Sequence, residues 1–277
     1  MNKLFVAYKP IFVSSNNFLK KLKWQDKAKS AGFSGTLDPF AKGVLIIAYG
    51  KYAKLFRFLK KTPKRYKATI FLGAESPSLD IENINEVKTV KKLDEEKVKK
   101  AILSIVGKQL QLPPKYSAKR IDGKRAYELA LKGEELNLKK VPIEVFKSEF
   151  IHYCHPFITF QCNVSEGTYV RVLAQDIVKK LGTFGTLSSL ERISEGMFTY
   201  QDKKPLDPME YLDLKENFYL GNKNLTHGPK LSFTDIKYTE PGFYYIKTDN
   251  ILRIIEVTNE KISYIINKIE LGNLHGE

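Results

Sequence analysis

The chain has 277 residues, a formal net charge of +15 and 43% hydrophobic residues, which is ordinary for a folded protein and excludes an intrinsically disordered one. No apolar run approaches the roughly 18–20 residues of a membrane helix, and the N-terminus lacks the apolar region and cleavage site of a secretory signal. Two cysteines, Cys154 and Cys162, exclude a disulfide framework and favour a reducing compartment, so we expect a cytoplasmic protein.

The first 72 residues alternate between short strands and helices. A serine before an apolar run predicts a helix start, apolar residues spaced three or four apart predict an amphipathic helix, and strict alternation predicts a half-buried strand. In chain order the predicted elements are a strand over 4–7, a helix capped by Ser14 or Ser15 that runs to about Ser30 and closes at Gly32, a loop over 33–43, a strand over 44–49, a helix over 51–59 and a strand over 66–72.

The middle of the chain mixes the same elements with longer loops. In chain order we predict an acidic loop over 74–92, a helix from Asp94 to Gly107, a loop that contains Pro113 and Pro114, a short helix over 125–131, strands over 145–150 and 157–164, a helix from Thr168 to Leu181 closed by Gly182, and a strand over 194–200. Strands and helices follow one another without a regular βαβ alternation. The pattern therefore predicts an α+β fold with a mixed, largely antiparallel central sheet flanked by helices.

The texture of the sequence changes near Asn217. Turn residues over 222–229 precede short β-rich runs over 243–246 and 262–266. We therefore predict a main domain over 1–216, with an insertion at about 108–140, followed by a short β-rich module over 225–277.

Nearly all of the excess positive charge lies in one quarter of the chain. Residues 1–67 hold 14 Lys and 2 Arg against two acids, Asp26 and Asp38. Such a block is expected to meet a polyanion such as RNA. The alternative is a general enrichment in lysine with the side chains solvated, but a general enrichment does not remove acids from one part of the chain.

The segment 31–43 holds the first candidate site residue. Asp38 precedes Pro39, which biases its backbone to an extended conformation, and Gly35 and Gly43 permit conformations closed to other residues. A rigid loop of this kind fixes a carboxylate that neighbouring cations keep ionised, as a nucleophile or charge stabiliser requires. The alternative is an Asx-Pro turn with a capping aspartate.

No metal site is expected. His152, Cys154 and His155 fall within four residues, but the sequence has no second cluster of the kind that completes a zinc site. On a strand, His152 and Cys154 would also point away from His155.

The loop over 35–43 has the sequence Gly-Thr-Leu-Asp-Pro-Phe-Ala-Lys-Gly and resembles the active-site loop of the TruB family of tRNA pseudouridine synthases. Other segments resemble further motifs of the family in the same order: 8–15 its opening motif, 64–67 its tyrosine-bearing strand, 111–127 its RNA-gripping insertion, 167–171 its arginine motif and 190–192 a later motif. The resemblance covers residues 1–195, or about 70% of the chain. It implies the pseudouridine synthase fold, with a small PUA-like RNA-binding module at the C-terminus.

The resemblance also implies an activity. The family isomerises uridine in RNA by breaking the bond from ribose C1′ to N1, turning the base and rejoining it through C5, without a cofactor. The expected substrate is uridine 55 in the T-loop of tRNA, flipped out of the fold. Apart from Asp26, the basic block offers no second acid of the kind that a glycosidase needs, which favours isomerisation over hydrolysis.

Five residues match the family's site. Asp38 matches the catalytic aspartate, whose attack on ribose or on the base remains open, and Arg171 matches the arginine that pairs with it. Tyr66 matches the tyrosine that stacks on the base and could relay the C5 proton, and Leu190 matches an apolar pocket residue. Lys9 is expected to support the pocket or to contact phosphate. Without the resemblance, each of the last four reads as an ordinary core or surface residue.

The insertion is rich in cations that are expected to contact phosphate: Lys115, Lys119, Arg120, Lys124 and Arg125. Three features depart from the family pattern. Phe33 stands where relatives carry a histidine, Lys132 stands where an arginine is common, and the C-terminal module is short.

We therefore predict a tRNA pseudouridine synthase that binds the T-arm stem-loop, with no cofactor, metal or membrane partner, and acts as a monomer. The alternatives are an RNA chaperone that uses the same groove and a basic ribosome-associated protein without a pocket. The ordered motifs argue against the last of these.

Overall fold

The structure is a computed structural model that describes residues 2–116, 120–121, 124–125 and 138–272. Within these residues a sheet of 8 strands runs through the molecule in the order β1-β3-β12-β4-β11-β10-β7, with β2 paired to β3. Its strands are β1 (Lys3–Lys9), β2 (Ala31–Ser34), β3 (Lys42–Tyr49), β4 (Lys64–Leu72), β7 (Gly107–Gln111), β10 (Val141–Cys154), β11 (Phe157–Val164) and β12 (Gly185–Glu195). Only the pairing of β12 with β3 is parallel. The predicted α+β fold with a largely antiparallel sheet is confirmed.

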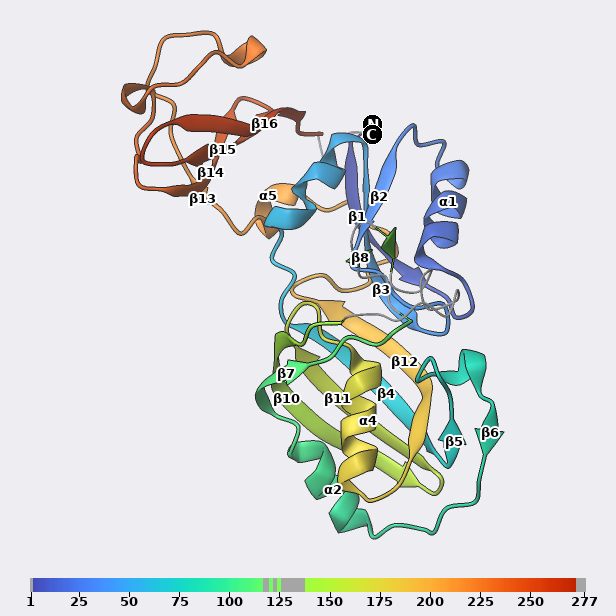
Figure 1. Cartoon of the computed structure of the whole chain (residues 1–277). Coiled ribbons are helices and arrows are strands. Elements are labelled where there is room, and N and C mark those ends of the chain that lie inside the picture. The colour runs from blue at the N-terminus through green and yellow to red at the C-terminus, as the bar shows by residue number, and fades with distance from the viewer. Residues whose placement is uncertain (1, 117–119, 122–123, 126–137, 273–277) are drawn as a thin grey trace.

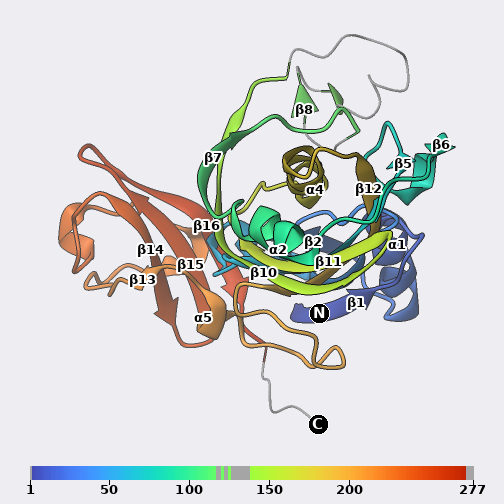
Figure 2. The same ribbon diagram turned by 90° about the horizontal axis from the view of Figure 1, so that it is seen from below.

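Helices cover the sheet on different sides. Figure 2 shows α2 (Glu95–Leu103) and α4 (Val170–Lys180) lying inside the curve of the sheet. Their apolar faces are buried there with the side chains of β4, β10 and β11. The helix α1 (Ser15–Gln25) packs instead on β1 and β3 through Phe18 and Leu22. Ser14 caps α1 and Asp94 caps α2, as predicted, by accepting hydrogen bonds from Asn17 N–H and Lys97 N–H.

The C-terminal segment forms a second sheet of 4 strands in the order β13-β14-β15-β16. The strands are β13 (Lys215–Glu216), β14 (Gly242–Thr248), β15 (Ile251–Val257) and β16 (Ile262–Glu270). This β-rich module was predicted and is present; its boundary and its likeness to a PUA module stay predictions. Leu252 and Ile254 of β15 share an apolar cluster with Leu4 of β1, so the module packs against the N-terminal strands. Figure 1 shows the two ends of the chain close together there.

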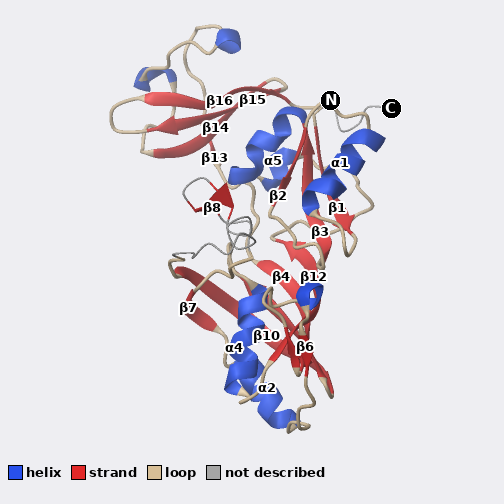
Figure 3. Ribbon diagram, turned by 45° about the vertical axis from the view of Figure 1, so that its right-hand side comes forward, coloured by secondary structure: helices blue, strands red, loops and turns tan. Residues whose placement is uncertain are grey.

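The remaining described elements are short. They are η1 (Gly50–Phe58), β5 (Ala74–Glu75), η2 (Ile81–Asn83), β6 (Glu86–Val87), β8 (Arg120–Ile121), β9 (Lys124–Arg125), α5 (Pro208–Tyr211), η3 (Leu225–His227) and η4 (Phe233–Asp235). Figure 3 shows how they are distributed among the longer helices and strands. No helix in these residues is long and apolar enough to cross a membrane.

Two predicted helices differ from the structure. The helix predicted over 51–59 is a 3-10 helix, because its buried residues Tyr52, Leu55 and Phe58 recur every third position, which a 3-10 helix aligns on one face. The helix α1 ends at Gln25 rather than near Ser30. Gly32 does not close α1 but lies in β2 opposite Ala48, where a side chain would press on the helix η1.

The strand predicted over 194–200 is wrong. The strand there is β12, which ends at Glu195, and the chain turns at Gly196 with φ +58°. Register shifts in β12, between Leu187 and Ser189 and between Arg192 and Ser194, hid this strand because they interrupt its alternation of polar and apolar residues. The short helix predicted over 125–131 lies almost entirely outside the described residues.

Candidate active site

The loop between β2 and β3 holds Asp38 rigidly. The hydroxyl of Ser15 donates to Leu37 C=O at 2.9 Å and accepts from Leu37 N–H at 3.0 Å, which ties the loop to the start of α1. Gly43 has φ +115°, and a Cβ there would lie 2.2 Å from Arg192 O. Gly35 also has a positive φ. The conformational role predicted for both glycines is therefore confirmed.

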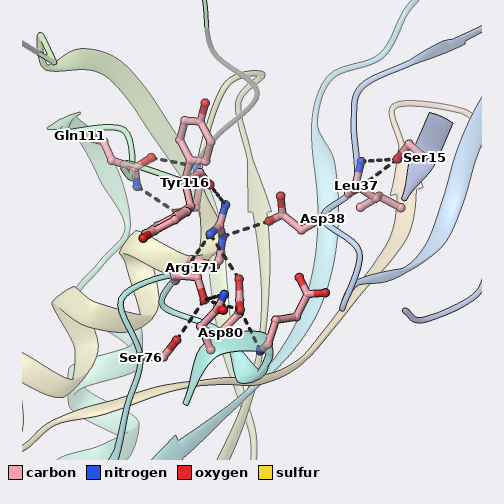
Figure 4. Close-up of polar contacts among 12 residues, drawn as sticks. Ser15, Leu37, Asp38, Ser76, Asp80, Gln111, Tyr116 and Arg171 are labelled. Atoms are coloured by element: carbon pink, nitrogen blue, oxygen red, sulfur yellow. Dashed lines mark hydrogen bonds and ion pairs between the residues drawn. The ribbon is translucent and has the colours of Figure 1, made fainter. Parts of the chain in front are cut away.

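Arg171 pairs with Asp38 from the first turn of α4. Its Nε lies 3.0 Å from Asp38 Oδ2, its Nη1 lies 3.3 Å from Asp80 Oδ2, and its Nη2 donates to Tyr116 C=O at 2.8 Å (Figure 4). The side chain of Arg171 is only 3% exposed, whereas that of Asp38 is 33% exposed. The guanidinium is thus fixed from three directions, and the carboxylate it holds stays open to a ligand.

Asp80 was not predicted as a site residue. It lies in the segment read as an acidic loop, directly before η2, and is buried. Its Oδ1 accepts hydrogen bonds from Ser78 Oγ at 2.7 Å and Glu82 N–H at 3.0 Å. The fold therefore brings a second acid to within one arginine of Asp38, and the lack of acids in the basic block does not separate isomerisation from hydrolysis. Asp26 lies elsewhere, at the end of α1, and accepts from Tyr49 Oη at 2.7 Å.

A cavity of about 290 Å³ opens beside this ion pair. Asp38, Tyr66, Arg171 and Leu190 all line it, so the structure brings together four of the five predicted residues. Its size is at the lower end of the range for small-molecule sites and suits a ligand about as large as one nucleoside. Tyr66 and Leu190 are buried apart from the surface that they turn to the cavity.

The wall of the cavity opposite Arg171 contains buried ions from motifs in which only Tyr66 and Leu190 were singled out. Lys64 Nζ lies 3.4 Å from Glu195 Oε1, and Arg192 Nη2 lies 3.3 Å from Glu195 Oε2. Arg192 also donates to Gly35 C=O and Val44 C=O, both at 2.8 Å. Arg192 therefore connects β12 to both ends of the Asp38 loop.

Burial controls the electrostatics of the two titratable groups in the cavity. Burial raises the pKa of Asp38 above its ordinary value, Arg171 opposes this rise, and Asp80 adds to it. Burial also raises the pKa of Tyr66, against the influence of Arg192. Arg171 is thus the main group that favours the anionic form of Asp38, and Tyr66 keeps its hydroxyl proton.

Lys9 does not line the cavity. It is buried, and its Nζ donates to Val13 C=O at 2.6 Å, to Pro10 C=O at 2.9 Å and to Pro39 C=O at 3.2 Å. Lys9 therefore joins the turn after β1 to the residue that follows Asp38. Burial lowers its pKa to about 8.

This shift predicts a pH dependence of stability. In the unfolded chain Lys9 titrates near its ordinary value of 10.5, so between pH 8 and 10.5 the unfolded state binds more protons than the folded state. The free energy of unfolding of the wild type should therefore rise relative to that of Lys9→Met across this window, by up to about 3 kcal/mol. Urea denaturation at several pH values measures this, with exposed Lys97→Met as the control. A difference that stays constant with pH would contradict the assignment.

Other predicted residues lie away from the site or are not described. Phe33 is half-buried on β2 and packs in the apolar cluster beneath α1, outside the cavity lining. Lys115 is exposed. Lys119 and Lys132 lie outside the described residues, and only the backbone of Arg120, Lys124 and Arg125 is described. Among the residues with described side chains, no group of three His, Cys, Asp or Glu could hold a metal ion.

Comparison with known proteins identifies the family. Residues 21–170 match the model of the TruB family pseudouridylate synthase N-terminal domain. The chain is 54% identical over 270 residues to tRNA pseudouridine synthase B of a Nitratiruptor species, an alignment that covers 97% of this chain and 98% of that relative. The chain belongs to the TruB family of pseudouridine synthases. The predicted family and the predicted class of enzyme, an isomerase, are confirmed.

Two further comparisons agree with this. The synthase is 49% identical over 272 residues to tRNA pseudouridine synthase B of Sulfurimonas denitrificans, covering 98% of this chain and 100% of the relative. Its fold is similar to a chain in the crystal structure of a Cbf5-Nop10-Gar1 complex, with a TM-score of 0.64 at 19% identity over 98% of the synthase and 84% of that chain.

Proposed function

We propose that the synthase isomerises uridine 55 in the T-loop of tRNA to pseudouridine, with Asp38 as the catalytic aspartate and a flipped-out base as the target. The single observation that carries this proposal is the Asp38–Arg171 ion pair at the wall of a cavity of nucleoside size. The names of the curated relatives, tRNA pseudouridine synthase B, support tRNA as the substrate.

Each side chain at the cavity has a role in this proposal. Arg171 holds Oδ2 of Asp38, while the described residues offer Oδ1 no hydrogen bond, so Oδ1 is free to approach C1′ of the ribose or the base ring. Leu190 excludes water beside the ion pair, which strengthens it. Tyr66 presents its ring to the base and its protonated hydroxyl to the reacting edge.

The reaction conserves all atoms of the nucleoside. The bond from C1′ to N1 breaks, the base turns within the cavity, and a bond forms from C1′ to C5. The proton that leaves C5 passes to solvent or to a base, and N1 takes up a proton. Asp38 needs only to stabilise or carry the electron-poor intermediate between the two bonds, and no cofactor is consumed.

The partner calls for no second subunit. A single compact arm of RNA can fill one cavity, so we propose that the synthase acts as a monomer in the cytoplasm. We also propose that the cations of the insertion and the C-terminal module contact the RNA backbone away from the target base.

A T-arm stem-loop tests the proposed activity. Incubation with the wild type should yield pseudouridine at position 55 only, read by derivatisation and mass spectrometry because the product has the mass of uridine. A stem-loop with cytidine at position 55 is the matched control and should yield none. Product at another uridine would contradict the assignment of the position. Tight binding without any product would instead indicate an RNA chaperone.

A further inference from the structure

The helix α1 carries a face that the fold does not use. Phe18 and Leu22 on one side of α1 are buried against β1 and β3. Trp24 on the other side is 80% exposed, and it is the only tryptophan of the chain. A large aromatic ring gains about 2–3 kcal/mol when it leaves water. The exposed indole is therefore a contact that a partner could use.

Uncompensated positive charge surrounds the indole. Five lysines of α1 and the turn after it are exposed: Lys20, Lys21, Lys23, Lys27 and Lys29. In the described part of the chain no carboxylate lies within ion-pair distance of any of them. Asp26, the one acid in this stretch, accepts a hydrogen bond from Tyr49. The surface is therefore complementary to a polyanion.

The cations and the indole share one surface. Lys20, Lys23, Trp24 and Lys27 line a shallow hollow at the C-terminal end of α1. The positions of Lys20, Trp24 and Lys27 differ by four and three residues, which places them along one side of the helix. The negative end of the helix dipole accounts for Lys23 in the last turn, but it does not account for an exposed tryptophan. A flat ring between cations is what an unpaired base and its two phosphates require.

The position of α1 connects this surface to the cavity. Ser15 at the start of α1 holds Leu37 beside Asp38. Trp24 follows nine residues later, or about 14 Å along the helix axis. That distance is too great for the target nucleoside and short enough for the same RNA molecule. Figures 1 and 3 show α1 on the opposite side of β1 and β3 from the C-terminal module, so the surface is not part of that module.

We propose that Trp24, with Lys20, Lys23 and Lys27, forms a second RNA-binding site of the synthase. An unpaired base of the substrate stacks on the indole, and the three ammonium groups bind the flanking phosphates. The identity of the RNA rests on the proposed function, and the site adds a contact remote from the target uridine.

Fluorescence tests this site directly, because Trp24 is the only tryptophan. Titration of the wild type with full-length tRNA should quench and shift the tryptophan emission with the same affinity as tRNA binding measured by filter retention. Emission that is unchanged at saturating tRNA would overturn the proposal.

Substitutions separate binding from catalysis. Trp24→Ala should weaken the affinity for full-length tRNA about 10-fold, Trp24→Phe should restore most of it, and kcat at saturating tRNA should stay unchanged. Replacing Lys20, Lys23 and Lys27 together with alanine should lower the slope of affinity against salt by up to about three phosphate contacts. The control variant, with alanine at the exposed lysines Lys91, Lys92 and Lys97, should leave both unchanged.

The outcomes distinguish this proposal from the proposed function. If Trp24→Ala leaves tRNA affinity at the wild-type value, the second site is wrong even where pseudouridine forms normally. If the wild type forms no pseudouridine but its tryptophan emission responds to tRNA, the second site stands and the proposed activity is wrong. A fall in kcat equal to the fall in affinity would show that Trp24 acts on the fold rather than on RNA.

Discussion

Replacing Asp38 with asparagine should abolish pseudouridine formation while tRNA still binds. Asparagine has nearly the same shape, so the loop anchored by Ser15 should keep its conformation. An amide is neither an anion nor a nucleophile, and loss of such a group lowers turnover by about 10⁴-fold or more. Single-turnover reaction of the T-arm stem-loop measures the effect, and binding is measured separately by filter retention.

The chain offers a matched control for this substitution. Asp26 is the only other acid in residues 1–67, and its carboxylate accepts from Tyr49 far along the chain from the cavity. Asp26→Asn should leave turnover within about twofold of the wild type, as expected of a surface change. Pseudouridine formation by Asp38→Asn at even a hundredth of the wild-type rate would contradict the role of the carboxylate.

The fold class and the Asp38 loop could be predicted because their signals are local. The irregular succession of strands and helices indicated an α+β fold, and the glycines and proline around Asp38 indicated a rigid loop. The remaining four residues, among them Arg171 and Tyr66, were reached through motif resemblance. The structure brings two of these, Arg171 and Leu190, to the cavity with Tyr66 from different strands and helices.

The charged groups around the cavity could not be predicted because their partners are distant in sequence. Asp80 meets Arg171 across 91 positions, and Arg192 meets Gly35 across 157. A buried acid in an acidic loop has the same local sequence as a solvated one. Lys9 illustrates the same limit, because a lysine after a strand gives no sign that its ammonium is buried among three backbone carbonyls.

The register shifts of β12 had a second consequence. They let this strand place Leu190 and Arg192 at the cavity while Glu195 ends the strand as their buried counter-ion. A bulge re-aims side chains in this way, and bulges occur often beside active sites. The segment whose secondary structure was mispredicted is thus the one that completes the wall opposite Arg171.

Replacing Arg171 with lysine should lower turnover by about 10²–10³-fold with little effect on tRNA affinity. The guanidinium reaches Asp38 through Nε, Asp80 through Nη1 and Tyr116 C=O through Nη2, and a single ammonium cannot span three directions. Affinity should be kept because Arg171 is buried and offers no surface to phosphates. Arg253→Lys is the control, since Arg253 is equally buried, donates to Thr248 and Leu225, and lies in the C-terminal sheet.

The pH profile of Arg171→Lys separates an electrostatic role from a structural one. Arg171 lowers the pKa of Asp38 against the effect of burial, so a less favourably placed cation leaves that pKa higher than in the wild type. Turnover requires the ionised carboxylate and is lost as the pH falls through its pKa. The acidic limb of the profile should therefore move to higher pH in the variant, and part of the lost activity should return as the pH is raised. A variant whose turnover falls equally at every pH, or whose tRNA affinity falls as much as its turnover, would show that Arg171 only supports the fold.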